Sequence, residues 1–184
     1  MKVAIRSITR EDQTPFLSAV RSSRRLHHPW VSPASNVTAF KRYLARNDGV
    51  SNFGFAVFLP ATGQWVGVVN LTNVVYGKFR SGYLSYYAFA GFEGRGYMRR
   101  GLLAVVRYSF VTLKLHRLEA NIQPGNTSSI ALVRRCGFLK EGFSPGYLKI
   151  NGRWRDHERW ALVHNARDMR SDRHFRPARS GPET

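Results

Sequence analysis

A short loop before the longest predicted helix contains two glycines and an arginine, in the order Glu93-Gly94-Arg95-Gly96-Tyr97-Met98. Glycine lets a ligand approach the backbone closely, and the start of a helix offers unpaired N–H groups and a partial positive charge to an anion. Residues of these types in this order could therefore bind a phosphate group. A Gly-x-Gly pair is also typical of an ordinary tight turn, so the loop alone leaves both interpretations open.

The elements that position this loop follow from the hydrophobic pattern. Stretches that alternate between apolar and polar residues, or are rich in β-branched and aromatic residues, predict strands at residues 3–8, 53–59, 65–75, 81–89, 118–122, 143–150 and 153–163. Apolar residues at helical spacing predict helices at residues 12–22, 36–47, 97–114 and 126–136. The expected order is strands, a long helix, a strand, a helix and a final hairpin.

Caps and turns set several of these boundaries. Thr9 is expected to cap the first helix, with Asp12 in the place of the Glu or Gln of a capping box. Asn126 is expected to cap the helix that ends before Gly137. A proline at position 29 predicts a loop at residues 26–30, because proline disfavours helical backbone in the residue before it.

The 184 residues are enough for one domain, expected at residues 1–165, with a flexible basic tail at residues 166–184. Since 43% of the residues are apolar and 13% are aromatic, the chain can bury a core, which excludes an intrinsically disordered basic protein. The longest apolar stretch is far below the roughly 20 residues of a membrane span, and the first residues lack a signal-peptide core. We therefore expect a soluble, cytoplasmic protein without membrane contact.

Cysteine and histidine usage argues against disulfide and metal chemistry. The single cysteine, Cys136, excludes an internal disulfide framework and a cysteine-based zinc cluster. Its place at a helix end, with no histidine near it in sequence, favours a small buried hydrophobe over a nucleophile. The six histidines are scattered without metal-ligand spacing, so no metal site is expected.

The net charge of +18 comes from 29 basic and 11 acidic residues. Two segments, residues 13–47 and 94–118, carry basic residues and no acid. An unbalanced positive surface attracts polyanions by releasing their counterions, which points to phosphates in a cofactor, an RNA or both. A genome biased towards arginine codons, with the arginines simply exposed to solvent, would produce the same composition. The charge alone therefore does not distinguish a phosphate-binding surface from a bias in composition.

Downstream of the glycine loop several motifs follow one another: Leu115-His116-Arg117-Leu118-Glu119-Ala120, Pro124-Gly125-Asn126-Thr127-Ser128-Ser129, Cys136-Gly137-Phe138, Glu141-Gly142-Phe143 and Asn151-Gly152-Arg153-Trp154-Arg155-Asp156-His157. With the loop, they resemble the GNAT acyltransferases, whose pyrophosphate loop has the pattern Gln/Arg-x-x-Gly-x-Gly/Ala. Gly96 matches the central glycine, whereas Glu93 and Met98 depart from the outer positions. The order of the motifs is similar to the ribosomal-protein-alanine N-acetyltransferase branch over roughly residues 3–163.

This resemblance implies the GNAT fold, an α/β fold with a mixed central sheet of about seven strands flanked by about four helices. It also implies acetyl-CoA as co-substrate, with the pyrophosphate held mainly by backbone amides. The implied cofactor-binding residues are Phe89, Gly94, Arg95, Gly96, Met98, Arg99, Arg100, Asn126 and Ser129. The alternatives are that Arg99 and Arg100 lie on a solvated helix face and that Asn126 only caps its helix.

The resemblance also suggests which residues handle protons and the acceptor. Ser129 falls where this branch carries a serine proposed to protonate the departing CoA thiolate, and Tyr147 is a competing donor because a phenol has a reference pKa near 10. The residues implied on the acceptor side are His28, Trp30, Trp154, Asp156 and His157. The alternative to these roles is that Tyr147, Trp154 and His157 simply pack in the hairpin.

No carboxylate occupies the region where one relative in this branch is thought to use a glutamate base, since Leu148 or Lys149 stands there. An α-amino group with a pKa near 7.8 is roughly a quarter neutral at cytosolic pH, whereas a lysine near 10.4 is about 0.1% neutral. The reaction needs the amine lone pair, so an N-terminal amine is favoured. The expected acceptor is the N-terminal alanine of a ribosomal protein, acetylated by direct transfer in a ternary complex.

Two other functions stay open. One is acetylation of a small antibiotic-like or amino-acid-derived amine, which a closed pocket would favour over a wide groove. The other is a ribosome- or RNA-associated assembly factor with little catalysis. A cationic enzyme repels a cationic amine at long range unless the amine arrives on anionic RNA. We therefore expect the acceptor to be presented on a ribosomal particle, with contact to ribosomal RNA.

Overall fold

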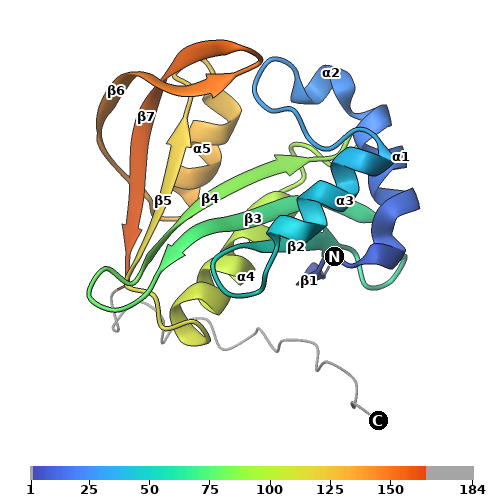
Figure 1. Ribbon diagram of the computed structural model, residues 1–184, viewed down its shortest axis with the longest axis horizontal. Helices are drawn as coiled ribbons and strands as arrows, with labels where there is room; N and C mark the ends of the chain where they lie inside the picture. Colours follow the sequence, from blue (N-terminus) through green and yellow to red (C-terminus); the bar gives the residue numbers. More distant parts are fainter. Residues whose placement is uncertain (1, 165–184) are drawn as a thin grey trace.

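A seven-stranded sheet organises the computed structural model, which describes residues 2–164 (Figure 1). The strand order is β1-β2-β3-β4-β5-β7-β6, and only the β4–β5 pair is parallel. The strands are β1 (Ala4–Ser7), β2 (Phe53–Phe58), β3 (Trp65–Val75), β4 (Ser81–Ala88), β5 (Arg117–Ile122), β6 (Leu139–Ile150) and β7 (Arg153–Val163). The predicted α/β class and mixed seven-stranded sheet are confirmed.

Helices cover both faces of the sheet. They are the 3-10 turn η1 (Arg10–Asp12) and the α-helices α1 (Gln13–Ser22), α2 (Arg24–His27), α3 (Val37–Arg46), α4 (Tyr97–Val111) and α5 (Thr127–Arg135). The short α2 is additional to the four predicted helices and contains Leu26 and His27, so the loop predicted at residues 26–30 begins only at His28, the residue whose backbone Pro29 restricts. Within residues 2–164, no helix is both long and apolar enough to cross a membrane.

Two predicted boundaries need adjustment, and one prediction lies outside the described residues. The helix predicted at residues 97–114 ends at Val111, and Lys114 has a left-handed backbone with φ of 56° that no helix continues through. The first strand of the final hairpin begins at Leu139 rather than at position 143. The tail predicted over residues 166–184 lies outside the described residues.

Two hydrophobic cores lie on opposite faces of the sheet, one under α4 and α5 and the other under α1 and α3 (Figure 1). Because successive strand residues point to opposite faces, neighbouring residues enter different cores. Val57 and Val69 pack under α4, while Ala56 and Val68 pack under α1 and α3. The continuous apolar runs in β2 and β3 are therefore a sign that both faces are covered.

Helix α4 lies unusually close to the sheet. A Cβ atom on Gly101 would lie 2.5 Å from Val57 Cγ1, and one on Gly67 of β3 would lie 2.4 Å from the backbone oxygen of Tyr87 and 2.6 Å from Met98 Sδ. Both glycines are thus required for close approach rather than for backbone freedom. The close packing of α4 at these two glycines fixes where the first turn of α4 lies relative to the end of β4.

The parallel strands β4 and β5 pair over a short stretch only. The paired residues are Ser81–Tyr83 with Arg117–Glu119. Strand β4 continues to Ala88 and β5 to Ile122, but the two strands are not paired beyond these residues and fan apart in Figure 1. The sheet therefore opens between β4 and β5 towards the carboxyl ends of both strands. We call this gap the β4–β5 opening.

An ion pair ties the edge strand β1 to the first helical turn. Both carboxylate oxygens of Asp12 lie 2.6 Å from the Arg6 guanidinium nitrogens, and the Thr9 backbone N–H donates to Asp12 Oδ2 at 2.8 Å. This is the predicted capping box, placed at η1. Burial alone would raise the pKa of Asp12, but the hydrogen bonds from Arg6 and Thr9 outweigh it and hold the pKa below its ordinary value.

We predict that Asp12→Asn lowers the free energy of unfolding by about 1–3 kcal/mol at neutral pH, because it removes charge-assisted hydrogen bonds from a buried site. The folded-state pKa is lowered, so the stabilisation exists above the unfolded pKa of about 3.9 and is lost as the pH falls through the folded value. Urea denaturation of both proteins between pH 3 and pH 7 measures this. A difference between them that grows as the pH falls would contradict the prediction.

Candidate functional site

The glycine loop forms an exposed turn directly before α4. Gly91, Gly94 and Gly96 have φ values of 88°, 72° and 73°, a region that residues with a Cβ rarely adopt. Gly96 is the N-cap of α4 and provides no capping side chain, and the first helical hydrogen bond runs from Arg100 N to Gly96 O at 3.3 Å. The earlier N–H groups of the first turn have no partner within the helix.

Two helix starts meet at the β4–β5 opening. Because β4 and β5 are parallel, their carboxyl ends lie at the same edge of the sheet, and α4 follows β4 just as α5 follows β5. Both helices cover the same face. Their N-terminal partial positive charges therefore converge on the opening, which is the arrangement that binds phosphate and other anions in open α/β sheets.

Tyr86 of β4 reaches the start of α5 across the opening. Its hydroxyl lies 2.7 Å from Ser129 Oγ and donates to the Ser129 backbone oxygen at 3.1 Å. Burial raises the pKa of Tyr86 well above its ordinary value, so the phenol is protonated at neutral pH. Sequence analysis identified Ser129 but missed Tyr86. The available signal was strand periodicity, which places Tyr86 on the same face as the buried Leu84.

Asn126 caps α5, as predicted. Its side-chain oxygen accepts a hydrogen bond from Ser129 N at 3.2 Å. The cap fixes the backbone of Ser129, and the Tyr86 hydroxyl lies beside that residue's side chain. The structure therefore connects Asn126, Ser129 and Tyr86 at one end of the opening.

Tyr147 and His157 lie together on the hairpin β6–β7. Their ring centroids are 6.0 Å apart, where the pairing of β6 with β7 shifts register between Ser144 and Leu148. His157 is 2% exposed, and its Nδ1 lies 2.9 Å from the backbone oxygen of Arg155. A carbonyl oxygen only accepts, so Nδ1 carries the proton. His157 is thus packed within the hairpin, while Tyr147 is only partly buried.

Asp156 and Trp154 occupy different environments on the same hairpin. Asp156 Oδ1 accepts a hydrogen bond from the Gly146 backbone N–H at 2.8 Å, which ties down the irregular part of β6. Trp154 is 65% exposed near the hairpin tip. Of the hairpin residues predicted on the acceptor side, Asp156 and Trp154 are both exposed, and Asp156 also has a structural contact.

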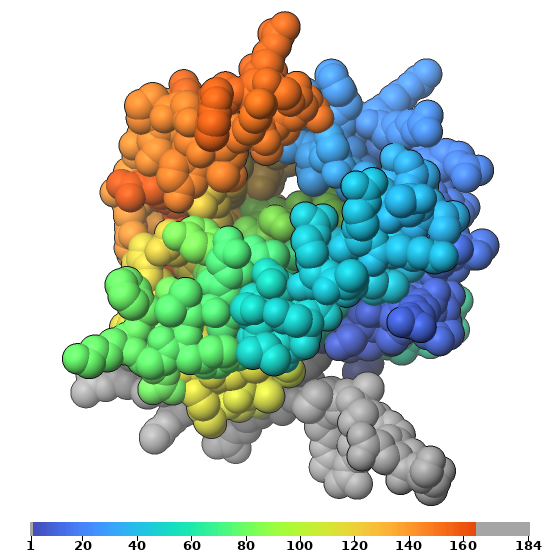
Figure 2. Space-filling view, viewed as in Figure 1, coloured from blue at the N-terminus to red at the C-terminus, as the bar shows by residue number. Residues whose placement is uncertain are grey.

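The loop between α2 and α3 contacts the β5–α5 connection and the tip of the β6–β7 hairpin. Trp30 lies against the β5–α5 connection, 3.2 Å from the position of a Cβ on Gly125, and Ser32 Oγ donates to Asn151 Oδ1 at 2.5 Å. The loop thereby bridges to the tip of the hairpin, and its first residue, His28, is exposed. Figure 2 shows the resulting hollow between the hairpin (orange), α3 (cyan) and β4 (green).

A groove of about 590 Å³ borders this hollow. It is open rather than enclosed, and runs between α3 and the α2–α3 loop. At its floor Tyr43 donates to Asn70 Oδ1 at 2.7 Å, and Asn70 Nδ2 donates to Ser85 Oγ of β4 at 3.3 Å. We call it the α3 groove; its lining residues are Val31, Ser32, Pro33, Ala34, Ser35, Ala39, Arg42, Tyr43, Arg46, Asn70 and Tyr87.

Two of the predicted cofactor residues have side chains that point away from the opening. Phe89 is 2% exposed within the α1–α3 core, and its N–H donates to Val66 O at 2.8 Å. Met98 is buried in the other core. Only backbone groups of these residues could contact a ligand there. His27 fixes this end of β4 by donating from Nε2 to Ala88 O at 2.9 Å.

The basic residues at the loop differ in their contacts. Arg99 Nε donates to the Arg135 backbone oxygen at 3.1 Å, so this guanidinium also caps the end of α5. The side chains of Arg95 and Arg100 are exposed beside the loop. The loop therefore places a helix start without a capping side chain beside exposed arginines.

Neither Cys136 nor a metal cluster adds chemistry to the described part of the chain. Burial raises the pKa of the Cys136 thiol to about 11, so it is protonated and unreactive at neutral pH, which agrees with the predicted buried hydrophobe. Among residues 2–164, no group of three or more His, Cys, Asp or Glu side chains could hold a metal ion.

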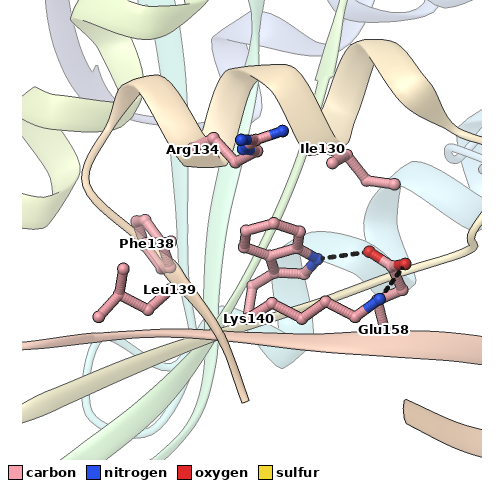
Figure 3. A pocket seen from close by; sticks show the side chains of 7 residues that line it. Ile130, Arg134, Phe138, Leu139, Lys140 and Glu158 are labelled. Atoms are coloured by element: carbon pink, nitrogen blue, oxygen red, sulfur yellow. Dashed lines mark hydrogen bonds and ion pairs between the residues drawn. The ribbon is translucent and has the colours of Figure 1, made fainter. Parts of the chain in front are cut away.

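A second cavity, of about 560 Å³, lies between α5 and the hairpin (Figure 3). Its carboxylate, Glu158, accepts a hydrogen bond from Trp160 Nε1 at 3.1 Å and pairs with Lys140. Ile130, Arg134 and Phe138 complete much of the wall. With its carboxylate engaged and no helix start at its border, this cavity lacks the features found at the β4–β5 opening.

The glycine loop between a strand and the start of the longest helix is the arrangement that the sequence motifs predicted, and the structure adds the parallel strand pair that opens beside it. The Acetyltransferase (GNAT) domain family matches residues 2–139, so the chain belongs to the GNAT acetyltransferase family. Members of this family use acetyl-CoA.

Particular relatives have related activities. The chain is 43% identical over 113 residues to the ribosomal protein uS5-alanine N-acetyltransferase of Escherichia coli, a match that covers 61% of this chain and 58% of that protein. It is 28% identical over 107 residues to spermidine N(1)-acetyltransferase of Vibrio cholerae, covering 58% and 61%. The chain thus spans about three fifths of these relatives.

Two solved structures are similar to this chain over about nine tenths of its length. The ribosomal-protein-S5-alanine acetyltransferase of Vibrio fischeri has a TM-score of 0.80 and 25% identity, covering 90% of this chain and 95% of that one. Mycobacterium smegmatis RimJ, solved in complex with CoA-disulfide, has a TM-score of 0.81 and 26% identity, covering 92% and 84%.

We predict that Asn126→Ala lowers the free energy of unfolding by about 1 kcal/mol, because it leaves the Ser129 N–H without its acceptor. Asn126→Asp should keep most of the stability, since a carboxylate also caps a helix. Asn36→Ala removes the equivalent cap of α3, which accepts from Ala39 N at 2.8 Å, and should cost about the same. Chemical denaturation of the three variants tests this; an Asn126→Ala protein as stable as the parent would refute the capping role.

Proposed function

We propose that this protein is an acetyl-CoA-dependent N-acetyltransferase that transfers acetyl directly to the N-terminal alanine of a ribosomal protein. The observation that carries the proposal is the β4–β5 opening, where two helix starts and the Tyr86–Ser129 pair meet beside an open groove. The likeness to the uS5-alanine enzyme of Escherichia coli supports the choice of acceptor. A groove suits a polypeptide end better than a closed pocket would.

The cofactor would lie across the opening. The N–H groups of the glycine loop and of the first turn of α4 bind its pyrophosphate, and the exposed Arg95 and Arg100 add charge. The pantetheine arm runs beside β4 beyond Tyr83, where that strand has no neighbour on its β5 side. Backbone groups of β4 there are placed to pair with the amides of the arm.

In the proposed reaction the neutral α-amine attacks the thioester carbonyl, a C–N bond forms, and the C–S bond breaks. The amine proton leaves to water, the CoA thiolate takes a proton from the Ser129 hydroxyl, and Ser129 regains a proton from water. When the Tyr86 O–H turns from the Ser129 backbone oxygen to Ser129 Oγ, the serine hydrogen is free to point at the thiolate. Tyr86 is therefore assigned as the positioning residue for Ser129, and Tyr147 remains the competing proton donor.

The surroundings favour an α-amine over a polyamine. The α3 groove is lined by Arg42 and Arg46 and by no acidic residue, so it would repel a polycation such as spermidine. Leu148 and Lys149 stand exposed on β6 and offer no carboxylate to deprotonate an amine. A substrate with a low-pKa amine needs no strong base, which suits a protein N-terminus.

The +18 charge supports presentation of the acceptor on ribosomal RNA. RNA would draw the enzyme to the particle by counterion release, and acetylation of the particle should then weaken steeply as salt rises. Acetylation of a free peptide at the same salt concentrations gives the matched comparison. Equal salt dependence of the two substrates would count against RNA contact.

The acceptor is tested with purified protein, acetyl-CoA and three amines of equal concentration. These are a peptide with N-terminal alanine, the same peptide with a blocked N-terminus and an internal lysine, and spermidine. We predict that the first is acetylated at least a hundredfold faster than the other two, because its amine is neutral far more often. Mass spectrometry identifies the products. Preferential acetylation of spermidine or of the internal lysine would overturn the proposal.

We predict that Ser129→Ala lowers kcat by about a hundredfold or more, the usual contribution of a positioned proton donor, while KM for acetyl-CoA changes little. Tyr86→Phe should lower kcat less, because the serine remains. Ser128→Ala, an exposed neighbour in the same turn, is the control and should behave as the parent does. Steady-state kinetics of the variants decide this, and a greater loss in Tyr147→Phe than in Ser129→Ala would reassign the donor.

A further inference from the structure

The α3 groove has a specific electrostatic character. Arg42 and Arg46 are four residues apart on α3, so their side chains lie on one face of the helix, and both line the groove. Both are exposed, and neither forms an ion pair with an acidic residue among residues 2–164. The opposite wall, from Val31 to Ala34, is mainly apolar. The groove therefore combines an apolar wall with two guanidinium groups that lack a carboxylate.

The groove also leads to the β4–β5 opening. Its floor continues from Tyr43 through Asn70 to Ser85, by hydrogen bonds of 2.7 Å and 3.3 Å. Ser85 lies two residues beyond Tyr83, the last residue of β4 that pairs with β5. A chain whose first amine sits in the opening would thus run outward across β4 and β3 towards α3.

The distances between neighbouring strands and between packed layers indicate which acceptor residues would reach the two arginines. Neighbouring strands lie about 4.8 Å apart and packed layers about 10 Å apart, whereas an extended chain advances about 3.4 Å per residue. The arginine pair is therefore reached roughly three to five residues after the acetylated one.

We infer that Arg42 and Arg46 form a subsite for a carboxylate side chain of the acceptor, about three to five residues after its acetylated N-terminus. The substrate class is thus a polypeptide with an acidic residue close to its N-terminus. Guanidinium groups bind carboxylates through paired charge-assisted hydrogen bonds. RNA phosphate is a less suitable occupant, because the apolar wall and the continuity with the opening match a peptide chain. The inference rests on the proposed function and specifies its substrate.

The test uses two peptides that differ at one position, both with N-terminal alanine and with either Glu or Gln at the fourth residue. The parent protein should acetylate the Glu peptide with a kcat/KM about tenfold higher, mainly through KM, because a charged hydrogen bond is lost with Gln. The double variant R42Q/R46Q should lose this preference. K41Q, a neighbouring α3 residue outside the groove, is the matched control and should keep it.

A charge reversal gives a second, positive readout. R42E/R46E should prefer a peptide with Lys at the fourth residue over one with Glu, an outcome that misfolding would not produce. Thermal unfolding of each variant with and without acetyl-CoA checks that the cofactor site is intact. Fluorescence anisotropy with labelled peptides and CoA-loaded protein measures binding without turnover.

The outcomes separate the inference from the proposed function. Equal acetylation of the Glu and Gln peptides by the parent protein, or an unchanged preference in R42Q/R46Q, overturns the inference and leaves the acetyltransferase proposal standing. Arginine-dependent binding of the Glu peptide without acetyl transfer supports the subsite while the proposed function fails. If R42Q/R46Q loses acetylation of ribosomal particles but keeps the Glu preference on free peptides, the arginines bind RNA and the carboxylate subsite is wrong.

Discussion

The parallel pairing of β4 with β5, limited to Ser81–Tyr83 and Arg117–Glu119, is the constraint on which the site depends. Parallel strands require a crossover connection, and the crossover here is α4, which returns the chain from the end of β4 to the start of β5. The same pairing directs both strands to one edge of the sheet. If β4 and β5 were paired along their full length, a ligand could not lie between them. If they were not paired at all, the two helix starts would not be held at the same edge.

Close packing of α4 on the sheet converts this topology into a defined site. Gly101 and Gly67 allow contacts with Val57 and with the Tyr87 backbone that any side chain would prevent. The packing on the sheet therefore determines the position of the α4 axis. Gly96 only has to turn the chain into the first turn of α4. This explains why Met98, two residues into the helix, can be a core side chain while its backbone borders the loop. Met98 thus contributes its side chain to the core and its backbone to the border of the glycine loop.

The elements of the fold could be predicted from the sequence because they rest on local signals. Alternating runs and runs rich in β-branched and aromatic residues marked the strands, Asn126 marked the start of α5, and the glycines marked the loop before α4. Contacts between distant segments leave no such signal. The Tyr86–Ser129 pair joins residues 43 positions apart, and the Ser32–Asn151 bond joins residues 119 positions apart. Likewise, family position suggested Phe89 as a cofactor residue, but only the sheet shows that its ring faces the α1–α3 core.

The ion pairs of the described chain also bear on how a basic enzyme could work without a carboxylate base. Asp12 pairs with Arg6, both Glu119 and Glu141 pair with Arg117, and Glu158 pairs with Lys140. These carboxylates stabilise the fold, and the remaining positive charge is not neutralised by them. A positive field disfavours the protonated form of a nearby amine and lowers its pKa. For the proposed reaction, this field would repel the protonated substrate at long range and favour the neutral, nucleophilic form once the amine is bound. A carboxylate on the acceptor, held away from the reacting amine, would then provide attraction without restoring the amine's proton.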